Sequence, residues 1–317
     1  MKHTKKITAI LISMFFLTQL IGLAVVYSYT PIVEQRMING TLQNVTINPL
    51  PYGMEPPPIE REVDFFMMLP YIATAFIVAI LFVFLLTRLK AAMFMRLWFF
   101  IVVILVLGIT MNAILMRFTP LSSYIALAIA LPLAIFKIFK RNMLVHNITE
   151  LMIYPGIAVV FIPLLNVWTI ILLLIAISLY DMWAVWHSGF MQKMAKFQMD
   201  ELKIFAGFFV PYLTKKQKQK IKKLKEQEDL AKTKKAKPKS MKVSVAILGG
   251  GDVVFPIITA GVIMRTLGFL PAVIVSVCAT LALGALFYYS KKGKFYPAMP
   301  FISAGLFVGI ILAYLVA

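Results

Sequence analysis

The chain has 317 residues, of which 61% are hydrophobic and only 14% are charged. This composition excludes an ordinary soluble domain and is typical of a protein that crosses a membrane several times. The formal net charge of +19 indicates contact with an anionic membrane face, and we expect no nucleic-acid partner. Because Cys278 is the single cysteine, the chain cannot form an internal disulfide or a cysteine-based metal site.

The amino-terminal segment begins with Lys2, Lys5 and Lys6 and continues as an apolar run to about Tyr29. A cleaved signal peptide would have a shorter apolar core and small residues before a cleavage site. The segment lacks both features, so we interpret it as a retained first membrane span.

Apolar runs of about 20 residues recur along the chain and predict an all-α polytopic membrane protein with nine transmembrane helices. The predicted spans are residues 7–29, 65–87, 97–116, 121–138, 149–165, 167–186, 245–264, 268–289 and 297–316. The fifth and sixth spans are separated by little more than Asn166, which predicts a tight helical hairpin.

The distribution of Lys and Arg predicts a cytoplasmic amino terminus. With that orientation the outer segments carry only Arg36, Arg61, Arg117 and Arg265, whereas every short cytoplasmic segment is rich in basic residues. The basic residues of these short segments are Lys2, Lys5, Lys6, Arg88, Lys90, Arg96, Lys137, Lys140, Arg141, Lys291, Lys292 and Lys294. An odd number of spans then places the carboxyl terminus outside.

The spans divide the chain into three parts. Residues 1–186 form a six-span part, residues 187–244 a cytoplasmic segment, and residues 245–317 a three-span part. We expect the cytoplasmic segment to begin with an amphipathic interfacial helix, about 190–209, and to continue as a lysine-rich flexible loop, about 215–242, on anionic lipid. The outer loop, residues 30–64, is rich in proline and contains two glycosylation sequons, at Asn39 and Asn44.

Of the 13 acidic residues, only Asp181 and Asp252 fall well inside predicted spans, while Glu150 sits at the inner end of the fifth. A carboxylate in the hydrocarbon region costs about 3 kcal/mol on insertion scales and is a functional candidate for that reason. At a helical rise of about 1.5 Å per residue, Asp181 lies about 8 Å and Asp252 about 10 Å from the inner ends of their spans. The sequence therefore predicts that the two carboxylates meet near the cytoplasmic side.

Two carboxyl groups held close together share one proton, because both cannot carry a negative charge at that distance. The ionised group can take a proton from a water molecule between them, and the protonated group can donate to a peptide carbonyl oxygen. Such a pair hydrolyses an amide without a metal or a cofactor, and we expect neither here. A proton- or cation-coupled transporter or channel that uses the same carboxylates is an open alternative.

The glycines before Asp252 favour proteolysis over transport. Gly249, Gly250 and Gly251 each disfavour a regular helix by about 1 kcal/mol relative to alanine. They also allow a second backbone to approach the carboxylate closely, which a protease that cuts an unwound helix requires. Close packing of the span against a neighbouring helix is the alternative explanation for these glycines.

Other intramembrane protease chemistries are excluded by their motifs. The histidines are His3, His146 and His187, and they form no His-Glu-x-x-His zinc motif. The chain has no Gly-x-Ser-Gly motif, and no span carries a histidine toward its middle, which excludes a serine–histidine pair.

Tyr180-Asp181 in the sixth span and Gly249-Gly250-Gly251-Asp252 in the seventh resemble the presenilin and signal peptide peptidase family of intramembrane aspartyl proteases. That family also has Pro-Ala-Leu at the start of its last span, where this chain has Pro297-Ala298-Met299. Met299 differs from the family's leucine but keeps an apolar side chain. Gly250 fills a position where the family often has a larger apolar residue, which implies a different choice of substrate.

The resemblance implies a hydrolase that cuts peptide bonds within transmembrane helices of single-span membrane proteins, with Asp181 and Asp252 as the catalytic pair. The residues that it assigns to substrate binding are Tyr180, Gly249, Gly250, Gly251, Pro297, Ala298 and Met299. The chain is similar to the microbial, archaeal members of the family, which implies a prokaryotic plasma membrane and no obligate partner subunit.

The prolines at the start of the last span also have a physical interpretation. Pro297 and Pro300 leave nearby backbone groups without helical partners. Those groups can pair with an extended substrate, which would join them as a β-strand beside the carboxylates. An ordinary helix start with proline in its first turn is the alternative.

Overall fold

The computed structural model describes residues 5–38, 41–47, 50–55, 62–89, 91–140, 142–188, 206–212, 244–290 and 296–317. Within these ranges nine helices are long and apolar enough to cross a membrane, which confirms the predicted all-α polytopic class. The helices are α1 (Lys5–Ser28), α2 (Glu62–Arg88), α3 (Ala92–Leu115), α4 (Ser122–Ile135) with the π-helical η1 (Phe136–Lys140), α5 (Met143–Phe161) with the 3-10 turn η2 (Ile162–Leu164), α6 (Val167–Trp183) with the π-helical η3 (Ala184–Ser188), α9 (Gly250–Leu267), α10 (Phe269–Tyr289) and α11 (Met299–Val316).

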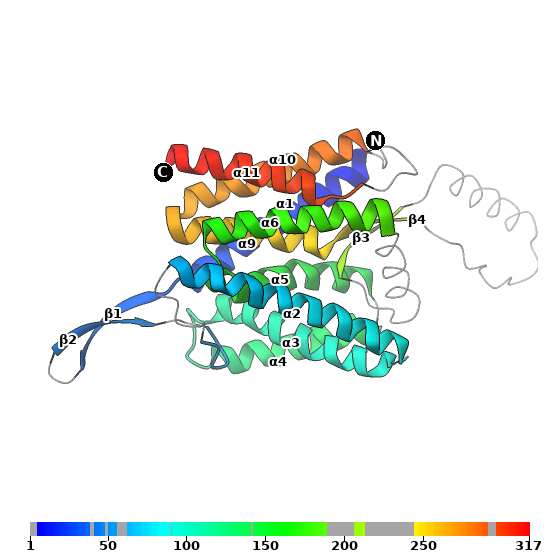
Figure 1. Cartoon of the computed structure of the whole chain (residues 1–317). Helices are drawn as coiled ribbons and strands as arrows, with labels where there is room; N and C mark the ends of the chain where they lie inside the picture. The colour runs from blue at the N-terminus through cyan, green and yellow to red at the C-terminus, as the bar shows by residue number, and fades with distance from the viewer. Residues whose placement is uncertain are drawn as a thin grey trace, which may run out of the picture.

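The helices run side by side in one bundle, and the two chain termini lie at opposite ends of it (Figure 1). α9, which begins next to Asp252, is the most enclosed helix, with 61% of its span buried. It packs against α1, α5, α6, α10 and α11, and its Ile257 and Ile263 are completely buried. The start of this helix is therefore held from several sides.

The predicted tight hairpin between the fifth and sixth spans is present and sets the position of α6. Asn166 Oδ1 accepts a hydrogen bond of 2.8 Å from the backbone N–H of Thr169, and the N–H of Asn166 donates to Thr169 Oγ1, also at 2.8 Å. This reciprocal capping box pairs two amides that would otherwise have no partner at the start of α6.

Two pairs of strands lie at the two ends of the bundle. Within residues 30–64, the predicted outer loop, β1 (Ile32–Ile38) and β2 (Thr41–Ile47) form an antiparallel hairpin that projects from the helices (Figure 1). At the other end, β3 (Gly207–Tyr212) pairs antiparallel with β4 (Ser244–Gly249), which runs directly into α9. Asn39, the remainder of the predicted amphipathic helix and the lysine-rich loop lie outside the described residues.

The second pair of strands corrects two sequence-based boundaries. Residues 245–249 belong to strand β4 and are not the first part of the seventh span. The predicted amphipathic helix cannot extend to Phe209, because residues 207–212 form strand β3. Both segments are short apolar runs, in which a strand and a buried helix have the same sequence pattern. The helical depth predicted for Asp252 is therefore wrong, although Asp252 does lie at the end of α9 that β3 and β4 cover.

α11 packs against α10 through two glycines one turn apart, Gly305 and Gly309. A methyl group added to Gly309 would lie 2.8 Å from Cα of Val275, and one added to Gly305 would lie 2.8 Å from the carbonyl oxygen of Cys278. Small residues at this spacing let the backbones of two membrane helices touch. The contact holds α11, whose first residue is Met299, in a fixed position.

We expect Gly309→Ala to destabilise the protein by about 1–3 kcal/mol, because the backbone of Val275 cannot withdraw from an added methyl group. Gly284→Ala is the matched control, since its methyl group would lie 3.6 Å from Ile12 Cδ1, an ordinary contact distance. Thermal unfolding of the detergent-solubilised variants measures the difference. Equal midpoints for the two variants would contradict close packing of α10 and α11.

Candidate active site

Asp181 and Asp252 lie at the end of the bundle that carries β3 and β4, each beside a helix terminus. Asp181 is in the last turn of α6, which ends at Trp183, and Asp252 is in the first turn of α9. α6 and α9 are in contact, and the charge of Asp181 acts on Asp252 across that contact. The structure thus brings together the two carboxylates that the sequence analysis selected.

The carboxylate of Asp181 is bonded to the start of α11. Only 7% of Asp181 is exposed, and its Oδ2 accepts a hydrogen bond of 3.0 Å from the N–H of Met299. The backbone of Ala298 also donates to this carboxylate. These amides belong to the N-cap residue and the first residue of α11 and have no partner within the helix, so Asp181 caps α11 from a different helix. The positive end of α11 in turn stabilises the negative charge of Asp181.

Asp252 occupies an equivalent place at the start of α9. Gly249 is the N-cap residue, with an extended backbone (φ −65°, ψ 147°), and its backbone hydrogen-bonds to the carboxylate of Asp252, which stands three residues later. This is the half of a capping box in which the N3 side chain reaches back to the N-cap amide. A methyl group on Gly249 would lie 3.1 Å from Asp252 Oδ2, so the missing side chain leaves room for the carboxylate.

The three glycines lie at the junction of β4 and α9, not in the interior of a helix. Gly250 is buried, and a methyl group there would lie 2.9 Å from both Cε1 and the hydroxyl oxygen of Tyr154. Gly251 is exposed, and its nearest neighbour would be Phe255 Cε2 at 3.9 Å. Gly250 is therefore required for packing, whereas Gly251 leaves the surface beside Asp252 open.

The other predicted site residues are placed differently. Met299 and Pro297 are buried, and Ala298 is partly buried. Tyr180 is 44% exposed, and its ring lies 6.3 Å from the ring of Trp183 on the outside of α6. The structure therefore groups Gly249, Ala298 and Met299 with the carboxylates and leaves Tyr180 on an exposed surface.

Two buried contacts that the sequence analysis did not identify reinforce this arrangement. Ser178 Oγ lies 2.9 Å from Ser303 Oγ, which joins α6 to α11 one turn away from the bond between Asp181 and Met299. Gln19 Nε2 of α1 donates to the carbonyl oxygen of Val253 at 3.1 Å, next to Asp252. The sequence signal for both contacts is a polar side chain inside an apolar span, where such side chains need a partner.

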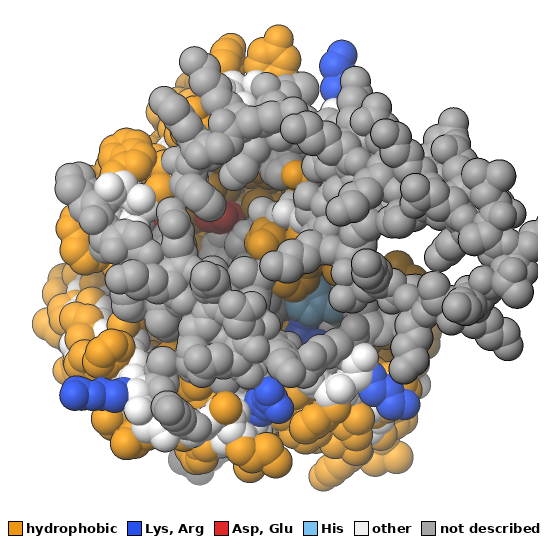
Figure 2. All heavy atoms as spheres, turned by 90° about the vertical axis from the view of Figure 1, so that its right-hand side faces the viewer, with side chains coloured by type: hydrophobic (Ala, Val, Ile, Leu, Met, Phe, Trp, Pro, Cys, Tyr) orange, Lys and Arg blue, Asp and Glu red, His pale blue; other side chains and the backbone are white. Residues whose placement is uncertain are grey.

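Figure 2 looks onto this end of the bundle. Acidic side-chain atoms lie in a recess of the surface, and Lys and Arg side chains lie near the outer rim of this face. Among the described residues, no group of three or more His, Cys, Asp or Glu side chains is arranged to hold a metal ion. The chemistry that the carboxyl groups of Asp181 and Asp252 can perform is acid–base chemistry.

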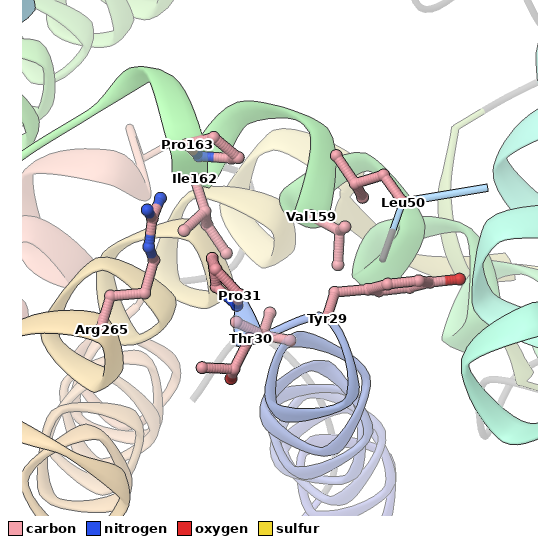
Figure 3. Close-up of a pocket in the computed structure, with 9 residues that line it drawn as sticks. Tyr29, Thr30, Pro31, Leu50, Val159, Ile162, Pro163 and Arg265 are labelled. Atoms are coloured by element: carbon pink, nitrogen blue, oxygen red, sulfur yellow. The ribbon is translucent and has the colours of Figure 1, made fainter. Parts of the chain in front are cut away.

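Two pockets of the described structure lie away from the carboxylates. One, of about 30 Å³, is lined by residues that include Tyr29, Pro31 and Arg265 at the far end of α9 (Figure 3). Arg265 is about 20 Å along the helix from Asp252 at a rise of about 1.5 Å per residue. The other, of about 860 Å³, is an apolar groove lined by residues of α1, α3, α5 and α10. Neither pocket belongs to the carboxylate site.

Comparisons with known proteins support the resemblance that the motifs suggest. The sequence profile described as "Signal-peptide peptidase, presenilin aspartyl protease" matches residues 59–317. A solved structure of a presenilin family intramembrane aspartate protease in space group C222 is similar in fold, with a TM-score of 0.57 and 14% identity over 98% of this chain and 99% of that one. A second, in space group P2, has a TM-score of 0.56 and 15% identity over 97% of each chain. No curated protein sequence matches. The chain is a multi-pass membrane protein that belongs to the signal-peptide peptidase and presenilin family of aspartyl proteases.

Proposed function

We propose that this protein cuts peptide bonds within the transmembrane helices of single-span membrane proteins, with Asp181 and Asp252 as the catalytic pair. The observation that carries the proposal is the position of the two carboxylates on the contacting helices α6 and α9. Asp181 is bonded to the first amide of α11, and Asp252 lies in the first turn of α9. Membership of an aspartyl protease family supports the same reaction.

In the proposed reaction, one carboxyl group is protonated and the other is ionised. The ionised group removes a proton from a water molecule, whose oxygen adds to the substrate carbonyl carbon, while the protonated group donates to the carbonyl oxygen. The roles then reverse as the leaving nitrogen gains a proton and the C–N bond breaks. The amino-terminal ends of α9 and α11 stabilise whichever carboxylate is charged at each stage.

We propose that the substrate binds as an extended strand, and the hydrogen bonds of the existing sheet indicate where. Peptide groups of a strand point alternately to its two edges. His146 and Asn147 of α5 hydrogen-bond to the backbone of Gly207 and Phe209, so these peptide groups face away from β4. Phe208, which lies between them, therefore faces β4.

The same alternation identifies the free edge of β4. Leu248 is the partner of Phe208 and faces β3, so the N–H and C=O groups of its neighbour Ile247, and of Val245, point to the opposite edge. Among the described residues this sheet has two strands, and no third strand covers that edge. A substrate strand added there lies beside the segment that leads into Asp252.

This assignment changes the role expected for the prolines at the start of α11. The amides of Ala298 and Met299 already donate to Asp181, so they are not available to pair with a substrate strand. We propose that Pro297, Ala298 and Met299 hold Asp181 in place and form the substrate's apolar surroundings. Tyr180 and Gly251 have exposed surfaces that a substrate can contact.

We further propose that the end with β3 and β4 faces the cytoplasm. Lys5, Arg88, Arg96 and Lys140 lie at or near the helix ends on this side, as the positive-inside rule requires, and Figure 2 shows Lys and Arg side chains near the outer rim of this face. We also propose the plasma membrane of a prokaryote as the location, anionic lipid as the partner of residues 215–242, and activity without a partner subunit.

We expect Asp181→Asn and Asp252→Asn each to lower cleavage of a single-span substrate by at least about 100-fold, because neither amide can transfer the required proton. In Asp181→Asn the new side chain would keep an oxygen for the amide of Met299, so the fold should persist. Gel analysis of cleavage by the purified variants, with thermal unfolding in parallel, measures both effects.

The control for these variants is Glu62→Gln, which removes a carboxylate at the opposite end of the bundle and should leave cleavage unchanged. If either aspartate variant cuts at the wild-type rate, the catalytic pair is assigned wrongly. Ion flux in reconstituted vesicles, with no proteolysis of any helix, would support the transporter alternative.

We expect Ile247→Pro to lower kcat/KM by about fivefold for each lost hydrogen bond of about 1 kcal/mol. Proline removes an N–H that points to the free edge, and no bond between β3 and β4 is lost. Ile247→Thr is the matched control, because threonine favours a strand and keeps the N–H. Equal kcat/KM values for these variants would exclude strand addition at this edge.

A further inference from the structure

The inner end of α5 carries a buried ion pair that the proposed reaction does not use. Lys137 Nζ lies 2.6 Å from Glu150 Oε1, and the two side chains are only 4% and 2% exposed. A buried ion pair contributes little net stability compared with well-packed apolar residues of similar volume, and it often serves to specify a geometry. The residues around this ion pair show that it orients His146 toward β3.

The ion pair orients His146, which bonds to β3. His146 Nδ1 lies 3.3 Å from Lys137 Nζ, and its Nε2 lies 2.8 Å from the carbonyl oxygen of Gly207. A lysine ammonium and a carbonyl oxygen act only as donor and acceptor, respectively. The imidazole therefore accepts from Lys137 through Nδ1 and donates to Gly207 through Nε2. Lys137 fixes which ring nitrogen carries the hydrogen.

Asn147 takes the place of a neighbouring strand along the same edge of β3. Its Nδ2 donates to the carbonyl oxygen of Phe209 at 2.8 Å, and its Oδ1 accepts from the N–H of Phe209 at 3.0 Å. A side-chain amide thus satisfies both backbone groups of one strand residue. Together, His146 and Asn147 attach β3 to the rigid helix α5 over two consecutive outward-facing positions.

β3 is in turn connected to the residues before Asp252. The N–H of Gly250 donates to the carbonyl oxygen of Ala206 at 3.2 Å, directly before β3. The fully buried Phe208 packs edge-on against Tyr154, with ring centroids 5.6 Å apart, and Tyr154 contacts Gly250. A shift of β3 relative to α5 would therefore move β4 and the first turn of α9.

We propose that Lys137, Glu150, His146 and Asn147 form a clamp, the α5 clamp, that positions the β3–β4 sheet and so determines which substrate bond reaches the catalytic pair. The inference rests on the proposed protease function. The hydrogen bonds of these side chains among the described residues join them to one another and to β3, not to Asp181 or Asp252. They are positioning residues for the reaction.

The test combines hydrogen exchange with analysis of cleavage products. Asn147→Leu keeps a similar volume but loses both bonds to Phe209, so exchange of the Phe209 amide should accelerate by about fivefold or more. With a single-span substrate in detergent, kcat should fall by a similar factor while KM stays within about twofold. Mass spectrometry of the products should show cleavage spread over neighbouring bonds.

A second pair of variants keeps the test decisive if Asn147→Leu does not fold. His146→Gln retains an N–H donor for Gly207 and should preserve the wild-type cut position, whereas His146→Leu should not. The matched control is Asn142→Ala, which removes the cap of α5, a 2.9 Å bond to the N–H of Leu144, without touching β3. This control should leave the cut position unchanged.

Two outcomes overturn the α5 clamp while leaving the proposed function intact. One is unchanged exchange of the 206–212 segment in Asn147→Leu and His146→Leu. The other is faster exchange with wild-type kcat and cut position, which would make the contact merely structural. A wild-type protein that cuts no helix would instead overturn the proposed function, and the positioning role with it.

Discussion

The hydrogen bond from the first amide of α11 to the carboxylate of Asp181 links the chemistry of the site to the fold. In and near hydrocarbon, a charged carboxylate and an unpaired amide are each costly. A helix start supplies amides that lack an intrahelical partner, and a carboxylate is their strongest acceptor. In the same way, the carboxylate of Asp252 accepts a hydrogen bond from the backbone of Gly249 at the start of α9. Each carboxylate is thus held by the helix terminus that it caps.

The rest of the bundle keeps these two helix starts next to each other. The glycine contact between α10 and α11 and the bond between Ser178 and Ser303 locate the start of α11 relative to α6. Gln19 holds the first turn of α9 from the opposite side. These contacts are far apart in the chain, so the site exists only when the first, sixth, seventh and last spans are all assembled.

Hydropathy was sufficient to predict nine spans, and the acidic residues within them were sufficient to select Asp181 and Asp252. Both inferences follow from the cost of burying charge in hydrocarbon, which is a property of single residues. The strand from Ser244 to Gly249 could not be predicted in this way, because a short apolar run has no period that separates strand from helix. The pairing of Asn147 with Phe209 could not be predicted either, because it joins segments about 60 residues apart that meet only after folding.

The occupation of β3 on both edges limits how much this sheet can bind. With β4 on one edge and α5 side chains on the other, β3 cannot accept an additional strand. On the proposed mechanism the sheet can therefore bind one additional strand at a time, and every strand that binds competes for the free edge of β4. A soluble peptide that adopts an extended conformation would act as a competitive inhibitor, whatever side chains it carries. Open sheet edges also promote aggregation by pairing with strands of other chains. In this sheet only the free edge of β4 needs protection from such pairing when no substrate is bound.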